Sequence, residues 1–245
     1  MDMTLGQSLA AFVSAALGAT LAVSIGVSHR QLCALISFAA GTLLSATLFH
    51  ILPDASAAGH SFIPLLLALG SGYGLFYFIS RYVSHVCPAC AASHFEEQPV
   101  SKFRSVFFLL AIALTIHSMM DGIAIALSSK TSGGADHSIF FTIAIHKLPE
   151  GLALCALLMK SGTSRNKAFI WSLFLETSTL IGWYLGHGLL LREVDIRWLD
   201  LVMVHIAGGF VYLAVHATIN EIRDHSPRLI LIFFLMGFLF MAFGH

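Results

Sequence analysis

The chain has 245 residues, of which 57% are hydrophobic and 11% are charged, and its formal net charge is zero. Soluble domains carry about 25% charged residues, so this composition indicates a polytopic membrane protein and excludes a sizeable soluble domain. The sequence carries no signature of nucleic-acid binding.

Eight apolar runs of about 20 residues predict eight transmembrane helices, because that length crosses the hydrocarbon core of a bilayer. We therefore expect an all-α polytopic membrane protein whose residues 1–245 form a single transmembrane domain. In chain order the predicted helices are Leu5–Gly26, Leu32–Leu52, Ser61–Ser80, Val106–Ser128, Ile139–Met159, Ala168–Leu191, Leu199–Ile219 and Leu229–Phe243.

Lys and Arg are unevenly distributed over the loops between these helices, and basic residues favour the cytosolic side of a membrane. Nine of them fall on one side and three on the other, with Lys147 inside a span. This bias predicts extracytosolic termini and places the loop at about residues 82–103 in the cytosol. We expect a plasma membrane or a bacterial inner membrane in preference to an organelle membrane.

Two neighbouring spans carry the same pattern of polar residues. The first reads LTIHSMMDGIAIAL, with His117 and Asp121, and the second reads FTIAIHKLPEGLALCALL, with His146 and Glu150. Residues four apart share one face of a helix, and a carboxylate at mid-membrane depth costs about 2.5–3.5 kcal/mol on insertion scales. Two imidazoles and two carboxylates that converge in a bundle would suit a divalent cation such as Zn²⁺.

Interhelical hydrogen bonds that lock the bundle are the alternative interpretation of these four residues. Residues in that role are usually Ser, Thr or Asn, whereas this chain has two carboxylates. Pro149 leaves the carbonyl of Ile145 without its helical partner, and Gly122 and Gly151 would allow close helix packing. These features add support to a metal site without requiring one.

The pair HSMMDG and HKLPEG resembles the signature of the fourth and fifth helices in the ZIP (Zrt-, Irt-like) family of divalent-metal transporters. GTLLSATLFHILPDA resembles the second helix of that family, and AGGFVYLAVHATINEI resembles its seventh. The resemblance implies a 3+2+3 helix arrangement with an inverted repeat. It also implies that His117, Asp121, His146 and Glu150 hold a metal, most readily Zn²⁺, on its way to the cytosol by alternating access.

Many family members hold a second metal beside the first, but this chain departs from their pattern. Ser118 and Lys147 occupy the corresponding positions, and a lysine ammonium has no acceptor atom with which to ligate a metal. Glu176 matches the acidic residue that borders the second position, and we expect it to pair with Lys147. An ion pair without a transport role is the alternative for Glu176.

Two further groups of polar residues lie outside the paired motifs. His50 and Asp54 flank Pro53 at the outer end of the second span, where they form either a metal-attracting vestibule or ordinary interfacial polar residues. The cytosolic loop contains His85, Cys87, Cys90 and His94. That spacing suits one side of a zinc site, and reduced cysteines in a flexible loop are the alternative.

A membrane transporter is the function that these residues favour, and an intramembrane zinc hydrolase of the ceramidase type is the competing class. Such an enzyme would need about three ligands and one open position for water, and His205 or His216 could supply the third imidazole. The carboxylate in each motif argues against it, as does the absence of HExxH. We expect no cofactor, a divalent metal as substrate, contact with the lipid bilayer and no enzymatic activity; a homodimer is left open.

The positive-inside bias predicts the outcome of cysteine labelling at Cys87 and Cys90. We expect a membrane-impermeant thiol reagent to leave both unlabelled in intact cells and to label them after permeabilisation, because the loop faces the cytosol. Labelling in intact cells would reverse the proposed orientation.

Overall fold

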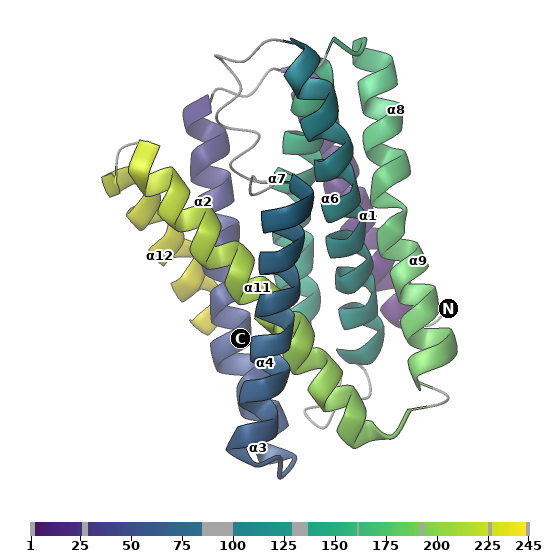
Figure 1. Cartoon of the computed structure of the whole chain (residues 1–245), viewed down its shortest axis with the longest axis vertical. Helices are drawn as coiled ribbons and strands as arrows, with labels where there is room; N and C mark the ends of the chain where they lie inside the picture. Colours follow the sequence, from purple (N-terminus) through teal and green to yellow (C-terminus); the bar gives the residue numbers. More distant parts are fainter. Residues whose placement is uncertain are drawn as a thin grey trace.

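In a computed structural model, the protein is a bundle of helices (Figure 1). The structure describes residues 3–25, 29–84, 100–128, 137–160, 162–191, 194–224 and 227–243, and within these ranges there is no β-strand. Helices satisfy every backbone hydrogen bond within one segment, which is what a chain in hydrocarbon requires.

The described helices form eight consecutive rods, three of which are interrupted by a change in helix type. The rods are α1 (Met3–Ser24); α2 (His29–Ala46) with η1 (Thr47–Ile51) and α3 (Leu52–Ala57); α4 (Phe62–Phe78) with η2 (Ile79–Ser84); α6 (Val100–Ser128); α7 (His137–Lys160); α8 (Arg165–Glu176) with α9 (Ser178–Leu185) and η4 (Gly186–Leu190); α11 (Ile196–Asp224); and α12 (Pro227–Phe243).

Among the described residues, six stretches are long and apolar enough to cross a membrane: Met3–Ser24, Cys33–Ala57, Phe62–Arg81, Ile139–Ala156, Arg165–Leu190 and Arg197–Ile219. Two shorter apolar stretches, Leu114–Ser128 in α6 and Pro227–Phe243 in α12, complete the set. The prediction of an all-α polytopic membrane protein is confirmed. Whether the chain forms one domain stays a prediction.

The second rod contains a π-helical turn, η1, immediately before Pro53. The backbone N–H of Leu52 bonds to the carbonyl of Thr47, five residues back. Proline has no N–H and cannot continue the regular ladder, and π turns are a common way for a helix to absorb such a break. The predicted second span therefore continues past Leu52, as α3.

Glycine allows the helices to pack in four close pairs, α1 with α7, α6 with α9, α2 with α12, and α4 with α11. In each pair both helices carry a glycine that packs against the backbone of the other helix. A Cβ atom at any of these positions would collide with a backbone carbonyl across the interface. The eight residues are Gly18 and Gly151, Gly122 and Gly182, Gly41 and Gly237, and Gly72 and Gly208.

These pairs have an internal symmetry. Suppose that rods one, two and three are exchanged in order with rods six, seven and eight, and that α6 is exchanged with α7. The α1–α7 pair then becomes the α9–α6 pair, and the α2–α12 pair becomes the α11–α4 pair. An inverted repeat of three helices around a central two produces this pattern. The pairs also fall into a first group (α1, α6, α7 and α8–α9) and a second group (α2–α3, α4, α11 and α12).

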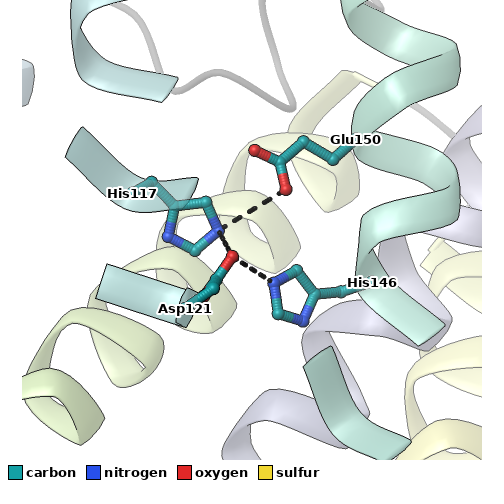
Figure 2. Close-up of side chains that lie close together, drawn as sticks. All are labelled: His117, Asp121, His146 and Glu150. Atoms are coloured by element: carbon teal, nitrogen blue, oxygen red, sulfur yellow. Dashed lines mark hydrogen bonds and ion pairs between the residues drawn. The ribbon is translucent and has the colours of Figure 1, made fainter. Parts of the chain in front are cut away.

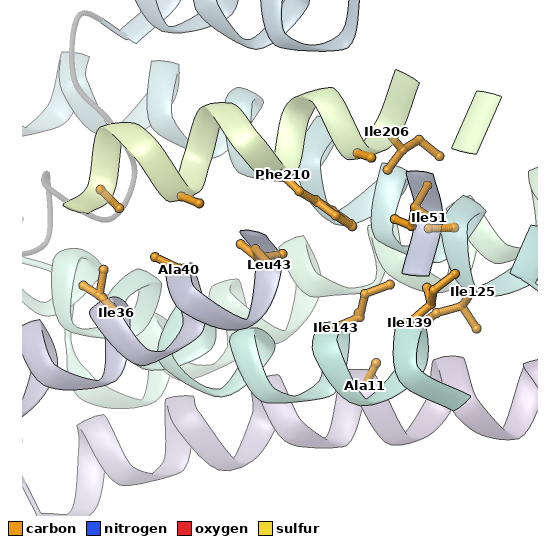
Figure 3. Close-up of a cluster of buried hydrophobic side chains, with 14 of the residues drawn as sticks. Ala11, Ile36, Ala40, Leu43, Ile51, Ile125, Ile139, Ile143, Ile206 and Phe210 are labelled. Carbon is orange, nitrogen blue, oxygen red and sulfur yellow. The ribbon is translucent and has the colours of Figure 1, made fainter. Parts of the chain in front are cut away.

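The apolar core runs between the two groups (Figure 3). Leu43 of α2 and Phe210 of α11 face Ile143 of α7, and all three side chains are buried. Large apolar side chains also cover the outside of the bundle; Phe62 of α4 and Tyr184 of α9, for example, are 74% and 68% exposed. An apolar exterior around an apolar core is expected of a protein whose solvent is lipid.

Helix α4 offers a matched test of the glycine contacts. Gly72→Ala should lower the free energy of unfolding by about 1–3 kcal/mol, as overpacking does, because its Cβ would meet the carbonyl oxygen of His205. Gly70→Ala should cause no loss, because a Cβ there has nothing within 4 Å. The stability of both variants is measured by thermal unfolding in detergent, with size-exclusion chromatography as the readout of folded protein. Equal stability of the two variants would contradict the packing argument.

Candidate metal site

The two paired motifs meet inside the first group of helices (Figure 2). His117 and Asp121 come from α6, and His146 and Glu150 come from α7. Each residue offers one ligand atom, and these atoms all lie within 4.8 Å of one another. The i,i+4 spacing puts each pair on one face of its helix, and the packing of the bundle brings the two faces around one small volume. That these residues ligate a metal stays a prediction.

The motifs face each other head to tail, so that the imidazole of one lies beside the carboxylate of the other. Nε2 of His146 is 3.2 Å from Oδ2 of Asp121, and Nε2 of His117 is 3.9 Å from Oε2 of Glu150. Within α6, Nε2 of His117 is 3.5 Å from Oδ2 of Asp121. Both imidazoles thus turn the same nitrogen toward the carboxylates, which is the arrangement that a shared cation needs.

Backbone and aromatic contacts hold the two imidazoles in place. Nδ1 of His146 lies 3.0 Å from the carbonyl oxygen of Thr142, one helical turn earlier, and this contact orients Nε2 toward the site. The ring of Phe76 packs edge-on against His117, with the ring centroids 5.9 Å apart, and the ring of Phe210 packs against His146 with the centroids 6.1 Å apart. Both phenylalanines belong to the second group of helices, so the site lies at the boundary between the groups.

The glycine that follows each carboxylate explains how α6 and α7 fit into the bundle. Gly122 meets the backbone of Thr179 in α9, and Gly151 meets Ala15 in α1. In both motifs the carboxylate therefore points into the cluster, while the glycine that follows it packs against a neighbouring helix. Pro149 lies within α7 and cannot donate a backbone hydrogen bond to Ile145.

Lys147 lies at the centre of the carboxylates and is fully buried. Its Nζ atom is 3.1 Å from Oδ2 of Asp121, 2.8 Å from Oε2 of Glu150 and 3.1 Å from Oε2 of Glu176. We expected Lys147 to pair with Glu176 and to lie near the first metal position, but not to form ion pairs with both motif carboxylates. The i,i+3 spacing of Lys147 and Glu150 was the available signal for one of them.

Ser118 links the lysine to the acids. Nζ of Lys147 donates a hydrogen bond to Oγ of Ser118 at 2.5 Å, and this hydroxyl lies 3.0 Å from Oε1 of Glu150 and 3.4 Å from Oε2 of Glu176. A hydroxyl has one proton, so it donates to one of these acids at a time. Ser118 and Lys147 thus occupy the space between Glu150 and Glu176 and connect these two acids through hydrogen bonds and ion pairs.

Glu176 reaches this network from the junction between α8 and α9. The hydroxyl of Thr177 bonds to the carbonyl oxygen of Phe174, and the backbone N–H of Thr177 is shared between Leu173 and neighbouring carbonyls. This local break ends α8 at Glu176, whose side chain is buried.

The other candidate residues lie elsewhere. His50 is buried in η1, with Nε2 3.4 Å from the carbonyl oxygen of Met241, and Asp54 is partly buried in α3. Neither belongs to the ligand cluster, and their vestibule role stays a prediction. His85, Cys87, Cys90 and His94 lie outside the described residues.

The two histidines of α11 also contact other partners. Nδ1 of His205 is 2.8 Å from Oγ of Ser71, and His216 stacks on Tyr212 with ring centroids 4.0 Å apart. The ligand cluster found among the described residues includes neither of them. A third imidazole for a catalytic zinc is therefore not supplied from this helix.

The two imidazole nitrogens and two carboxylate oxygens form a cluster, inside a bundle of membrane-spanning helices, that could hold a divalent cation. A family model for the ZIP zinc transporter matches residues 89–244. The chain belongs to the ZIP zinc transporter family. Because the members of this family are transporters, the family assignment favours a transporter over the intramembrane hydrolase, and we conclude that the protein is not an enzyme.

Individual relatives agree with the family model. Zinc transporter ZupT of Shigella dysenteriae is 26% identical over 234 residues, which is 92% of this chain and 87% of that protein. A putative zinc transporter of Arabidopsis thaliana is 27% identical over 80% of this chain, and a zinc transporter of Caenorhabditis briggsae is 26% identical over 54% of it. The chain spans about a third of the length of the plant and nematode relatives.

Proposed function

We propose that this protein transports a divalent cation, with Zn²⁺ as the first candidate, through the site formed by His117, Asp121, His146 and Glu150. The observation that carries the proposal is the convergence of these four ligand atoms within 4.8 Å in the interior of a membrane protein. Mixed imidazole and carboxylate ligands suit Zn²⁺ better than Mn²⁺ or Fe²⁺. The relatives are themselves named zinc transporters.

The position of the site supports transport by alternating access. All four ligands belong to the first group of helices, whereas Phe76 and Phe210, which cover the imidazoles, belong to the second. Rigid movement of one group against the other would uncover the ligands without disturbing their geometry. In this proposal the ion enters from the outer side, past His50 and Asp54, and leaves toward the cytosol.

The charge of the site favours a single metal ion. The carboxylates of Asp121, Glu150 and Glu176 surround one ammonium, that of Lys147, so their ionised forms leave two net negative charges. One divalent cation neutralises these charges, and a second would create an uncompensated positive charge in a medium where such charges are costly. In this proposal the site therefore binds one metal ion.

The proposed function also bears on the membrane in which the protein lies and on what it binds. The protein is an integral membrane protein, and the likeness to ZupT favours a bacterial inner membrane or plasma membrane. Its substrate is the metal ion and no separate cofactor is needed. A homodimer in the bilayer remains one option for its assembly.

Removal of the ligands on α7 tests the transport site. His146→Ala with Glu150→Ala should lower Zn²⁺ uptake into proteoliposomes by more than about tenfold, because loss of outer-shell partners alone costs 10–100-fold in metal affinity. His216→Ala, which removes an imidazole outside the cluster, is the matched control and should retain uptake. Normal uptake by the double variant would refute the proposed site.

Replacement of Lys147 tests the number of metals. Lys147→Asp changes the charge of the site by two units, which corresponds to one additional divalent cation. We expect two adjacent peaks in anomalous scattering from metal-soaked crystals of this variant and one peak in the unmodified protein. Two peaks bridged by Glu150 in the unmodified protein would contradict the charge argument.

A further inference from the structure

Lys147 binds the same oxygen atoms that the metal would use. Its Nζ contacts Oδ2 of Asp121 and Oε2 of Glu150, and these two atoms also face Nε2 of His117 and of His146. A cation among the four ligands would lie close to the ammonium and be repelled by it. A metal could therefore occupy the four ligands only if the ammonium withdrew from these two oxygen atoms.

We propose that Lys147 is a tethered counter-ion that competes with the substrate metal for Asp121 and Glu150, and that Glu176 receives its ammonium when the metal binds. The inference rests on the proposed function, since it concerns how that site is filled and emptied. Lys147 then determines which cations are accepted and how readily they leave.

The hydrogen-bonding capacity of the lysine shows that its present contacts are exchangeable. An ammonium has three N–H donors, but four acceptors surround Nζ. Its distances to Asp121, Glu150, Glu176 and the hydroxyl of Ser118 all fall between 2.5 and 3.1 Å. Hydrogen-bond geometry holds for Ser118 and Glu176, whereas the contacts with Asp121 and Glu150 are ion pairs alone. The latter two contacts can therefore lengthen without leaving the ammonium unpaired.

Glu176 has the free capacity to act as the receiving group. Its Oε2 already accepts a hydrogen bond from Lys147, while its Oε1 is buried and makes no hydrogen bond to the described part of the chain. A buried carboxylate oxygen without a donor is unfavourable. Movement of the ammonium toward Glu176 would satisfy this oxygen while it frees Asp121 and Glu150 for the metal.

Ser118 links the two arrangements. Its hydroxyl lies within hydrogen-bonding distance of both Glu150 and Glu176. When the ammonium leaves Glu150, the hydroxyl proton can remain on Glu150 and replace part of the lost contact. The exchange therefore needs only short movements within an existing network.

A tethered ammonium also selects for charge. A monovalent ion offers Asp121 and Glu150 no more charge than the ammonium that it displaces, whereas a divalent ion offers twice as much. The same competition opposes tight retention, because the ammonium returns to the two carboxylates as the metal leaves. Moderate affinity of this kind is what release on the far side of a membrane requires.

Three variants separate the competing ammonium from the net charge of the site. Lys147→Gln removes the ammonium and makes the site more negative by one charge. Lys147→Gln with Glu176→Gln removes the ammonium but keeps the original net charge. Glu176→Gln keeps the ammonium and removes its proposed receiver. Zn²⁺ affinity is measured on the purified full chain in detergent by competition with a zinc-chelating dye, and uptake is measured in proteoliposomes.

We expect both variants that lack the ammonium to bind Zn²⁺ at least about tenfold more tightly, a change that corresponds to 1.4 kcal/mol, and to show a lower maximal rate of uptake. Glu176→Gln should bind Zn²⁺ more weakly than the unmodified protein. If the charge-matched double variant binds like the unmodified protein while Lys147→Gln binds more tightly, net charge alone is responsible and the inference is wrong. Unchanged or weaker binding by Lys147→Gln overturns it as well.

Failure of this inference differs from failure of the proposed function. If the unmodified protein takes up Zn²⁺ and the His146→Ala, Glu150→Ala variant does not, the transport site stands whatever the lysine variants do. If Lys147→Gln does not fold, as judged by size-exclusion chromatography, Glu176→Gln still decides the matter. Binding by Glu176→Gln that equals or exceeds that of the unmodified protein would exclude a receiving role.

Discussion

Three carboxylates meet in this helical bundle; Asp121 and Glu176 are buried and Glu150 is partly buried. The surrounding structure is organised around the need to stabilise them. On insertion scales a charged side chain at this depth costs about 2.5–3.5 kcal/mol. Asp121, Glu150 and Glu176 offset part of that cost through a single ammonium, that of Lys147, and through the two imidazoles. With the three carboxylates ionised and both imidazoles neutral, two net negative charges remain, and the proposed divalent cation would neutralise them.

Such a site needs rigid walls, because a displacement of an ångström or two would leave a buried charge without its partner. The reciprocal glycine contacts supply this rigidity. Gly122 and Gly151 lie beside the site carboxylates and bring α6 against α9 and α7 against α1. Close backbone packing of this kind holds helices together in a medium without a hydrophobic driving force between them. The boundary between the two groups of helices, where Phe76 and Phe210 cover the imidazoles, is instead built from side chains.

This contrast connects the fold to the proposed function. Contacts inside each group are made at the level of the backbone, whereas the contacts between groups near the site are aromatic and aliphatic, as with Leu43 and Ile143. Side-chain interfaces without directional hydrogen bonds can slide or separate at a smaller cost. In the proposed mechanism the four side chains keep their geometry while the covering surface moves, and the ammonium of Lys147 neutralises part of the charge after the metal has left.

Much of the architecture was predictable from local sequence. Apolar runs of about 20 residues identify the helices because the thickness of a bilayer sets their length, and the i,i+4 spacing of His117 with Asp121 and of His146 with Glu150 follows from helical geometry alone. The interruption of the sixth rod at Thr177 and the π-helical turn before Pro53 were not anticipated, since both depend on how the chain redistributes backbone hydrogen bonds.

The sequence by itself determined the fold class, the number of described helical rods and the two helix faces that carry a histidine and a carboxylate, because each of these is set within one helix. Only the tertiary structure decided that the motifs meet head to tail, that glycines pair α1 with α7 and α6 with α9, and that Lys147 reaches Asp121 as well as Glu176. Those relations join helices that are distant along the chain. They depend on the register and separation of packed helices, which a pattern of residues along one helix does not specify.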